Sequence, residues 1–201
     1  VGSGDYEEPK IEDVKELDLP DSGGETFEDT KSHWAKKEIE EMAAMNYING
    51  SNGKFRPDDD ITRAEFVSIM VRILGLNASE AGDISFSDVK STDWFGKNVA
   101  LAAKKGLVKG YENGTFKPNS PITRQEIGAI LGTILDEDLT DEQIEDIFSN
   151  YSDSVQKWAR PSVAAAIKAQ IIQGFPNKTF GGQLNATRAE ATVMLSRFLK
   201  Y

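Results

Sequence analysis

The sequence contains no cysteine and only one histidine, His33. The absence of cysteine excludes disulfides, thiol catalysis and cysteine-ligated metal sites. A single histidine has no second one with which to bind a metal, and we expect His33 at the surface near a helix start. The sequence also lacks phosphate-loop, dinucleotide-binding and Gly-x-Ser-x-Gly motifs. No pair of carboxylates recurs in an apolar setting that would raise a pKa. We therefore expect neither an enzyme nor a cofactor.

Long hydrophobic runs are absent as well. No apolar run approaches the roughly 20 residues that span a bilayer, and no charged segment followed by an apolar one opens the sequence as in a signal peptide. We expect no membrane insertion; a mature secreted protein would have the same appearance. Hydrophobic residues make up 39% and charged residues 28% of the chain, which predicts that most of it folds and is soluble.

The net charge of −10 is unevenly distributed along the chain. Residues 1–29 carry eleven acids and two lysines, a net charge of −9, and residues 136–146 carry seven acids and no base, a net charge of −7. The remaining residues therefore carry +6. A basic core suits an anionic ligand, and an ordinary scatter of solvated charge explains it equally well. The acidic segments and the lack of a known reader motif argue against nucleic acid as a partner.

One short motif occurs three times. Thr62-Arg63-Ala64-Glu65 returns as Thr123-Arg124-Gln125-Glu126 and as Thr187-Arg188-Ala189-Glu190. Each copy predicts a helix start with a capping box, in which the Thr hydroxyl and the Glu carboxylate bond to each other's backbone N–H groups. The Arg then lies at the first helical position, where the unpaired N–H groups and the helix dipole favour anions. An Arg there adds a bidentate clamp for a carboxylate or phosphate.

The spacing of other landmarks shows that whole segments repeat, because a Trp precedes a Gly by 16 residues and a loop Phe precedes the Arg by 8 in every copy. The third, sixth, seventh and tenth residues after each Arg are apolar, which predicts an amphipathic helix. In the first copy we expect helices over about 32–46 and 63–74, with Gly50 in a positive-φ conformation between them. We expect Trp34, Ile39, Met42 and Ala43 on the apolar stripe of the first of these.

The chain divides at these landmarks into an acidic, mostly disordered lead-in at 1–25, a first repeat at 26–76 and a second, with its linker, at 77–135. An acidic insert at 136–147 precedes the third repeat at 148–201. In the insert, Thr140 and Gln143 predict the cap of a short helix. Each helix–loop–helix unit is too small to bury its own apolar faces, so the three must share one core.

The combination of Phe-x-Asp, Trp, a closing Gly, Gly-x-Phe-x-Pro and Ile-Thr-Arg-Ala-Glu resembles the surface-layer homology family, over about residues 26–201. The resemblance implies an all-α pseudo-threefold trimer with a shared central helical bundle and grooves between adjacent repeats. It also implies an extracellular cell-surface domain, fused to further domains, that anchors its protein non-covalently to secondary cell-wall polysaccharide. The implied partner is an anionic polymer that carries pyruvate-ketal N-acetylmannosamine.

By the same resemblance, one Arg lines each groove and binds the ligand: Arg63, Arg124 and Arg188. The resemblance extends the ligand-binding role to Asp29, Asp88, Trp34, Trp94, Trp158, Gly50, Gly110 and Gly174. A pyruvate ketal presents a carboxylate on a sugar ring, which suits an Arg for the carboxylate and an aromatic face for the ring. If the arginines serve the ligand alone, replacing Arg63 or Arg124 by Ala should leave the melting temperature nearly unchanged.

Each of these residues also has a purely structural interpretation. The arginines can be solvated helix-start residues or partners of a nearby Asp, the tryptophans can belong to the core, and the glycines can serve the backbone. Residues 58–60 are three consecutive Asp residues, but they lack the spacing of a calcium loop and predict no metal site. A protein-interaction or assembly module and a glycan-processing enzyme stay open as alternative functions.

The third copy departs from the other two. Asn150 stands where we align Asp29 and Asp88, and Gly181-Gly182-Gln183 stands where the other copies have a basic residue followed by Pro. Ala186 replaces an Ile. We therefore expect the three grooves to bind unequally. The groove that relies on the loop of the third copy should be the weakest, and we assign that loop to Arg188.

Overall fold

The computed structural model describes residues 26–201; the predicted lead-in at 1–25 lies outside this part. Seven α-helices and two short 3₁₀ helices form in the described residues, and no strand does, which confirms the all-α prediction. The bounds of the elements are η2 Glu28–Thr30, α1 Lys36–Ala44, α2 Arg63–Ile73, η3 Ala78–Glu80, α3 Gly96–Lys104, α4 Arg124–Leu135, α5 Asp141–Ser149, α6 Arg160–Lys168 and α7 Arg188–Leu199.

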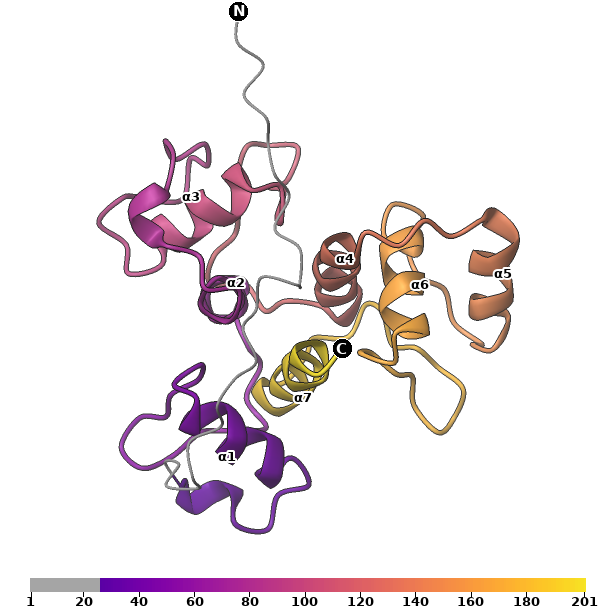
Figure 1. Ribbon diagram of the computed structural model, residues 1–201, viewed down its shortest axis with the longest axis horizontal. Coiled ribbons are helices and arrows are strands. Elements are labelled where there is room, and N and C mark those ends of the chain that lie inside the picture. Colours follow the sequence, from indigo (N-terminus) through magenta and orange to yellow (C-terminus); the bar gives the residue numbers. More distant parts are fainter. Residues whose placement is uncertain (1–25) are drawn as a thin grey trace, which may run out of the picture.

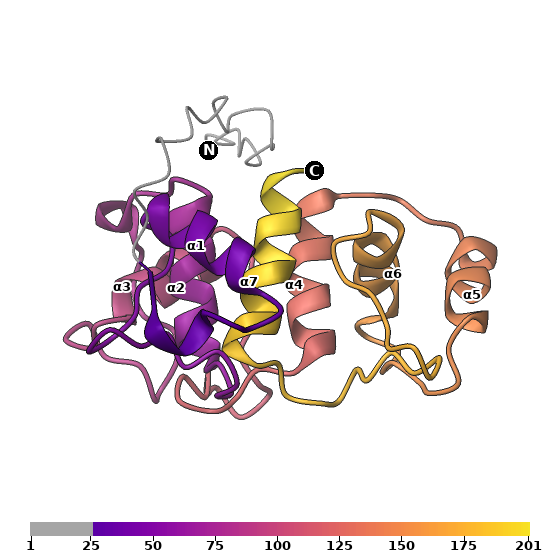
Figure 2. The same cartoon turned by 90° about the horizontal axis from the view of Figure 1, so that it is seen from below.

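The three helices that begin at the repeated motif, α2, α4 and α7, lie together at the centre of the molecule (Figure 1). Their axes run in similar directions, and Figure 2 shows α7 and α4 side by side. The first helices of the repeats, α1, α3 and α6, surround this bundle in three lobes (Figure 1). The predicted pseudo-threefold arrangement with a shared central bundle is thus what the chain adopts.

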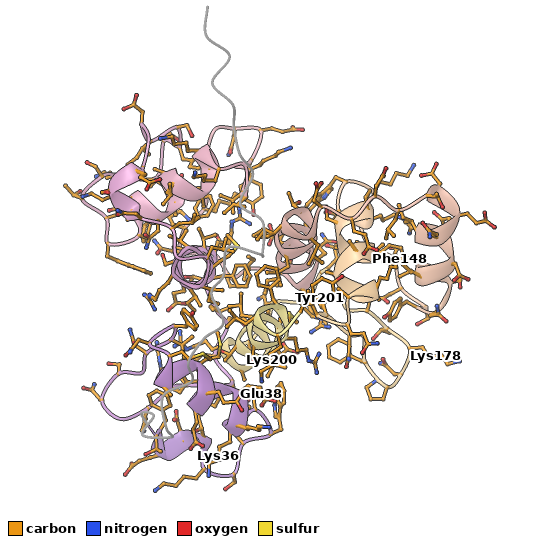
Figure 3. The ribbon with its side chains drawn as sticks, viewed as in Figure 1. Lys36, Glu38, Phe148, Lys178, Lys200 and Tyr201 are labelled. Carbon is orange, nitrogen blue, oxygen red and sulfur yellow. The ribbon has the colours of Figure 1, made fainter. Side chains whose placement is uncertain are left out.

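Each outer helix packs against the central helix of the preceding repeat. Helix α3 packs on α2, α6 packs on α4, and α1 packs on α7, so the C-terminal helix receives the N-terminal one. Lys200, labelled near α1 in Figure 3, pairs its Nζ with Glu41 Oε2 of α1 at 2.8 Å. The repeat in the sequence is therefore not the packing unit, because each lobe combines two repeats.

The predicted apolar stripes form the core. Most of the predicted residues are buried, including Ile39, Met42, Phe66, Met70, Ile127, Leu131, Val163, Ala164, Leu195 and Phe198. Ile69, Ile134 and Ile167 are half-buried and pack against the same core. Burial of this many large side chains, at about 1.5–3 kcal/mol each, supplies the main driving force for folding.

A ring of three backbone hydrogen bonds joins the repeats just before the central helices. Ile61 N–H donates to Ala186 O at 3.1 Å, Ala186 N–H to Ile122 O at 2.9 Å, and Ile122 N–H to Ile61 O at 3.0 Å. All three residues are buried. Because the three hydrogen bonds form a closed cycle, each repeat needs both of the others to complete its bonds at this point.

The helix starts depend on neighbouring repeats in the same way. All three central helices have the predicted capping box, with Glu65 N–H donating to Thr62 Oγ1 and Thr62 N–H donating to Glu65 Oε2 in α2. The next two N–H groups, of Arg63 and Ala64, donate to Ser120 O and Pro118 O in the second repeat, both at 3.0 Å. Helices α4 and α7 repeat the pattern with carbonyls of the third and first repeats. The first four N–H groups of these helices are therefore occupied, and the prediction that they form an anion site is wrong.

The short helix that Thr140 and Gln143 predict begins in the acidic insert and runs on to Ser149. Helix α5 begins with a capping box between these two residues and packs on α6. Phe148, labelled in Figure 3, lies under the guanidinium of Arg160, whose Cζ is 4.3 Å from the ring centroid. Arg160 Nη2 also pairs with Glu145 Oε1 at 2.7 Å. The insert thus extends the lobe of α6 away from the central bundle.

Replacing Thr62 by Ala should lower the free energy of unfolding by about 1 kcal/mol, because Glu65 N–H loses its cap at the start of a central helix. Chemical denaturation would measure the change. Ser32→Ala, at an exposed position before α1, is the control and should stay within about 0.5 kcal/mol of wild type. Equal stability of Thr62→Ala and wild type would contradict a structural role for the cap.

Candidate functional site

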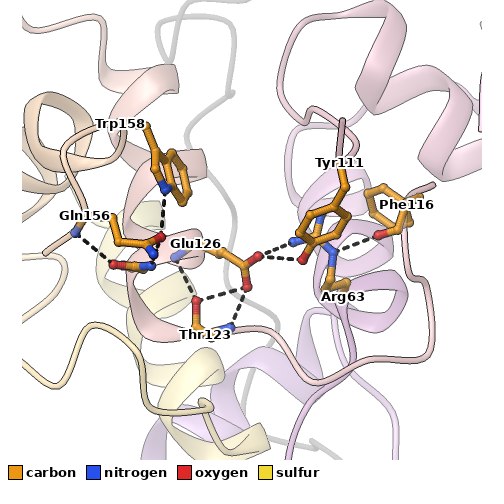
Figure 4. Close-up of polar contacts among 8 residues, drawn as sticks. Arg63, Tyr111, Phe116, Thr123, Glu126, Gln156 and Trp158 are labelled. Carbon is orange, nitrogen blue, oxygen red and sulfur yellow. Dashed lines mark hydrogen bonds and ion pairs between the residues drawn. The ribbon is translucent and has the colours of Figure 1, made fainter. Parts of the chain in front are cut away.

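The arginine of each repeated motif reaches into the next repeat. Arg63 Nε donates to Phe116 O at 2.9 Å, and Arg63 Nη1 pairs with Glu126 Oε1 at 2.9 Å (Figure 4). Glu126 belongs to the capping box of α4, so one carboxylate serves both the helix start and the arginine of the previous repeat. Arg63 is only 5% exposed.

The same arrangement runs round the molecule. Arg124 pairs with Glu190 at 3.4 Å and Arg188 pairs with Glu65 at 3.2 Å, which closes a cycle of three ion pairs. The Nε groups of these two arginines donate to Phe180 O at 3.2 Å and Phe55 O at 2.9 Å, and their Nη2 groups donate to Gln173 O at 2.6 Å and Asn49 O at 3.3 Å. Each arginine has an intramolecular partner, as the structural interpretation of the sequence allowed, but the partner is a Glu of another repeat rather than a nearby Asp.

Burial has the expected electrostatic consequence for two of these arginines. Desolvation lowers the pKa of Arg124 and of Arg188, and the charges of Glu190 and Glu65 oppose that shift. A guanidinium stays protonated at any physiological pH. Since the charge cannot be lost, the paired glutamates and the loop carbonyls are needed to stabilise it in a buried position.

The predicted aspartates organise the loop that follows the first helix of each repeat. Asp29 accepts from the N–H groups of Phe55 and Arg56, at 2.9 and 2.8 Å, and Asp88 accepts likewise from Phe116 and Lys117. Desolvation acts to raise the pKa of Asp29, but the backbone hydrogen bonds, with a contribution from the charge of Lys54, outweigh it and hold the pKa below its usual value.

The counterpart of these aspartates in the third repeat is Asp153, which accepts from the N–H groups of Phe180 and Gly181. The alignment with Asn150 is therefore wrong. Asn150 lies at the end of α5, where its amide donates to the carbonyls of Asp146 and Ile147. Phe148-Ser149-Asn150, at the end of the insert, is similar in sequence to the Phe-x-Asp segments of the other repeats, but the structural equivalent is Tyr151-Ser152-Asp153. The sequence alignment was therefore wrong by three residues.

The predicted glycines are required by close packing. A Cβ at Gly50 would lie 2.3 Å from Phe27 Cε1 and 2.6 Å from Lys54 O, and Gly110 and Gly174 meet Phe86 and Tyr151 in the same way. Gly50 does not have a positive φ, contrary to the prediction. The left-handed residues that end the first helices lie four positions earlier, at Asn46, Gly106 and Gln170.

The three predicted tryptophans lie at the surface. Trp34, Trp94 and Trp158 are 65, 67 and 61% exposed, so the interpretation of these residues as core is wrong. Trp158 is also held in place, because its Nε1 donates to Gln156 Oε1 at 2.8 Å and the same oxygen accepts from Gln125 Nε2 at 2.8 Å (Figure 4). A large exposed ring in a fixed orientation is suited to packing against a sugar.

A groove at the junction of the repeats brings several predicted site residues together. It has a volume of about 190 Å³, and its walls include Gly50, Glu65 and Arg188 together with Trp94 of the second repeat. The sequence did not predict most of the other lining residues, among them the polar residues Ser51, Lys54, Arg56, Ser68 and Arg72. Of these, Ser68 and Arg72 lie on the helix that starts with the motif, at positions that the apolar pattern does not mark.

The prediction about the altered third loop must be corrected in one respect. The loop of the third repeat contacts Arg124, through Phe180 O, whereas Arg188 binds the loop of the first repeat. Gly181 has a φ of 69°, close to the 59° of Arg56 and the 56° of Lys117, and Gly182 O accepts from Gln125 N–H as Pro118 O accepts from Ala64 N–H. The altered residues thus keep the backbone geometry of the other loops.

Comparison with known proteins identifies the family. The model of the S-layer homology domain matches residues 26–67, 85–127 and 150–192. The chain belongs to the S-layer homology domain family. The third match begins at residue 150, next to the Tyr151-Ser152-Asp153 segment that the structure aligns with the other repeats.

Several curated proteins contain a segment similar to this S-layer homology chain. An amylopullulanase of Thermoanaerobacterium thermosulfurigenes is 38% identical over 179 residues, which cover 87% of the chain and 10% of the relative. Exoglucanase XynX of Acetivibrio thermocellus is 35% identical over 87% of the chain and 16% of the relative. A cellulosome-anchoring protein of the same species is 31% identical over 74% of the chain and 34% of the relative. The chain therefore spans about a third or less of these relatives.

Among residues 26–201, no helix is both long enough and apolar enough to cross a bilayer. Surface-layer proteins of Lysinibacillus sphaericus and Brevibacillus choshinensis are also similar, at 29% and 28% identity. The extracellular, cell-surface location expected from the sequence agrees with membership in this family.

The buried ion pairs change the expectation for the arginines. Arg124→Ala should lower the free energy of unfolding by about 3 kcal/mol or more, because it leaves the Glu190 carboxylate and the Phe180 carbonyl without their partner. Arg197→Ala, at an exposed position on α7, is the control and should cost no more than about 0.5 kcal/mol. Urea unfolding of both variants measures the difference; a loss below 1 kcal/mol for Arg124→Ala, about the size of a surface pair, would argue against the ring of ion pairs.

Asp29→Asn should destabilise the protein by about 1 kcal/mol at neutral pH, since Asn keeps one acceptor oxygen and no charge, and partial exposure reduces the effect. The folded-state pKa of Asp29 is depressed, so its contribution exists above the unfolded-state pKa and is lost as the pH falls through the folded-state pKa. The gap between wild type and variant should therefore narrow in urea titrations as the pH is lowered towards about 2. Glu28→Gln is the exposed control, and a gap independent of pH would contradict the assignment.

Proposed function

We propose that this chain anchors a larger bacterial surface protein non-covalently to the cell wall, by binding secondary cell-wall polysaccharide in the grooves between its repeats. The observation that carries the proposal is the groove at Arg188, which combines a guanidinium, an exposed Trp and a glycine-bearing loop on one concave surface. The relatives named as cellulosome-anchoring and surface-layer proteins support an anchoring role.

The arginine retains hydrogen-bonding capacity despite its ion pair. A guanidinium has five N–H donors, and the bonds of Arg188 to Phe55, Glu65 and Asn49 use one on each nitrogen. One N–H then remains on each terminal nitrogen. Two terminal N–H groups of a guanidinium are able to bind a carboxylate in a bidentate manner. The ion-pair ring therefore orients the arginine for a ligand as well as stabilising the fold.

The charge of the groove favours an anionic sugar. Lys54, Arg56, Arg72 and Arg188 line it against a single acidic residue, Glu65. A sugar with a pyruvate ketal would offer its carboxylate to these cations and its ring to Trp94. We therefore propose that the ligand is pyruvylated; the resemblance to the family, not the groove, suggests N-acetylmannosamine as the pyruvylated sugar.

The proposed anchoring role also implies that this chain is one part of a longer protein. The relatives suggest fusion to enzymes or to surface-layer proteins, with this chain as the wall-binding part. A polymer repeats its sugar many times, so two engaged grooves on one chain would add avidity without any new contact.

Purified wall polymer should bind to the chain, and removal of its pyruvyl groups should weaken binding at least about tenfold, as expected when a charge-assisted bidentate contact is lost. Isothermal titration calorimetry with both polymers measures this. Trp94→Ala should also weaken binding while the melting temperature stays near that of wild type, because the ring is 67% exposed.

Equal binding of both polymers would contradict pyruvate recognition, and failure of wild type to bind either would contradict the anchoring function. Release of reducing ends from the polymer would instead support the glycan-processing alternative. Lys31→Ala, at an exposed position outside the lining of the groove, is the matched surface control.

A further inference from the structure

The surroundings of the three arginines differ at the residue that directly follows Gly50, Gly110 or Gly174. This residue is Tyr111 in the second repeat and Phe175 in the third, but Ser51 in the first. The Tyr111 ring lies over the guanidinium of Arg63, with 4.9 Å from Cζ to the ring centroid, and Phe175 lies over Arg124 at 4.5 Å. These aromatic residues cover two of the three arginines on the side of the loop.

Arg188 has a different environment. It contacts the ring of Phe55 at 4.7 Å, which corresponds to the contacts of the other arginines with Phe116 and Phe180 in their own loops. The residue at the position of the covering aromatic is Ser51, which is exposed and has a small side chain. The groove of about 190 Å³ is found here, with both Ser51 and Arg188 in its wall.

Tyr111 is fixed in its covering position. Its hydroxyl donates to Glu126 Oε1 at 2.8 Å, the same oxygen that pairs with Arg63 (Figure 4). Lys117 Nζ also lies over the Tyr111 ring, 4.2 Å from its centroid. The Tyr111 ring thus covers one face of the Arg63 guanidinium and is held there by a hydrogen bond to the same carboxylate.

Helix α2 adds a second, independent difference. Ser68 is 3% exposed, lines the groove, and its Oγ is the one buried side-chain polar atom in residues 26–201 without a hydrogen-bond partner. An unpaired buried hydroxyl costs free energy, and a ligand oxygen or N–H in the groove would pair with it. The residues at this position of the other central helices are Ala129 and Val193, which offer no hydroxyl.

Arg72, one turn beyond Ser68, also lines the groove and donates to Tyr47 O. Its counterpart in α4 is Thr133, whose hydroxyl donates to Ala129 O at 2.8 Å within its own helix. The counterpart of Arg72 in α7 is Arg197, so an arginine at this position does not distinguish the groove. Among the three arginines of the motif in residues 26–201, only Arg188 thus combines a small residue at the position of the covering aromatic with a buried, unpaired hydroxyl on the central helix of the next repeat.

We propose that the groove at Arg188 is the principal carbohydrate site of this chain, that Ser51 keeps it open, and that the Ser68 hydroxyl bonds to the ligand. The grooves at Arg63 and Arg124 are closed by Tyr111 and Phe175 and bind more weakly. This inference rests on the proposed function, and it assigns an order to the grooves and names the two serines that set it.

The test uses Ser51→Tyr, which places in the first repeat the side chain that the second repeat has at this position. The control is Ser51→Ala, which keeps the groove open, and Tyr111→Ser tests the reverse exchange. The probes are the pyruvate-ketal N-acetylmannosamine monosaccharide and purified wall polymer, measured by calorimetry on the whole chain. Ser51→Tyr should weaken binding of the monosaccharide at least about tenfold, and Ser51→Ala by less than about twofold; tenfold corresponds to about 1.4 kcal/mol.

Ser68→Ala provides a readout that a structural role cannot imitate. Removal of an unpaired buried hydroxyl should leave the melting temperature equal or higher, whereas affinity for the monosaccharide should fall about three- to tenfold, the loss expected for one hydrogen bond. A fall in both stability and affinity would contradict the assignment of this hydroxyl to the ligand.

The outcomes separate the two proposals. If wild type binds the polymer and Ser51→Tyr, folded by its melting temperature, binds equally well, the order of the grooves is wrong while the anchoring function stands. Strong loss of binding in Tyr111→Ser, with Ser51→Tyr unaffected, would make the groove at Arg63 the principal site. Absence of any binding by wild type would overturn the proposed function itself.

Discussion

The closed cycle of Arg–Glu pairs between repeats is the constraint on which the rest of the structure depends. Each glutamate caps its own helix and holds the arginine of the preceding repeat, so a helix start and a repeat junction are stabilised by the same carboxylate. The ring of backbone hydrogen bonds through Ile61, Ala186 and Ile122 reinforces the junction. Because the interactions close on themselves, the three repeats form one cooperative unit, and the groove is a consequence of that closure.

Under the proposed function, the groove residues have two roles, one in the fold and one in binding. Asp29 binds the loop that carries Phe55, and the Phe55 carbonyl then orients Arg188. Gly50 lets the Phe27 ring approach the same loop. A rigid supporting shell of this kind holds a binding side chain in place before the ligand arrives, which reduces the entropic cost of binding. Substitution of such a residue therefore affects the fold and the site together, whereas exposed residues such as Trp94 report on the site alone.

The three repeats share one backbone scaffold but differ in the side chains around their arginines. Backbone geometry is preserved even where the loop of the third repeat has Gly181 and Gly182, since the carbonyls and N–H groups that matter belong to the main chain. The side chains at Ser51, Tyr111 and Phe175 differ, and only the last two lie over an arginine of the ring.

The sequence by itself determined the elements that depend on local chemistry. The capping boxes, the amphipathic helices and the all-α class follow from spacing and from side chains that act within one turn. Motif matching failed where an insert imitated a landmark, as Asn150 did for Asp153. Only the tertiary structure decided which repeat each arginine joins, why the tryptophans are exposed and which groove is open, because a pairing such as Arg188 with Glu65 joins residues more than a hundred positions apart. Sequence spacing predicts contacts within a helix, but a contact across the closed ring depends on how the helices pack.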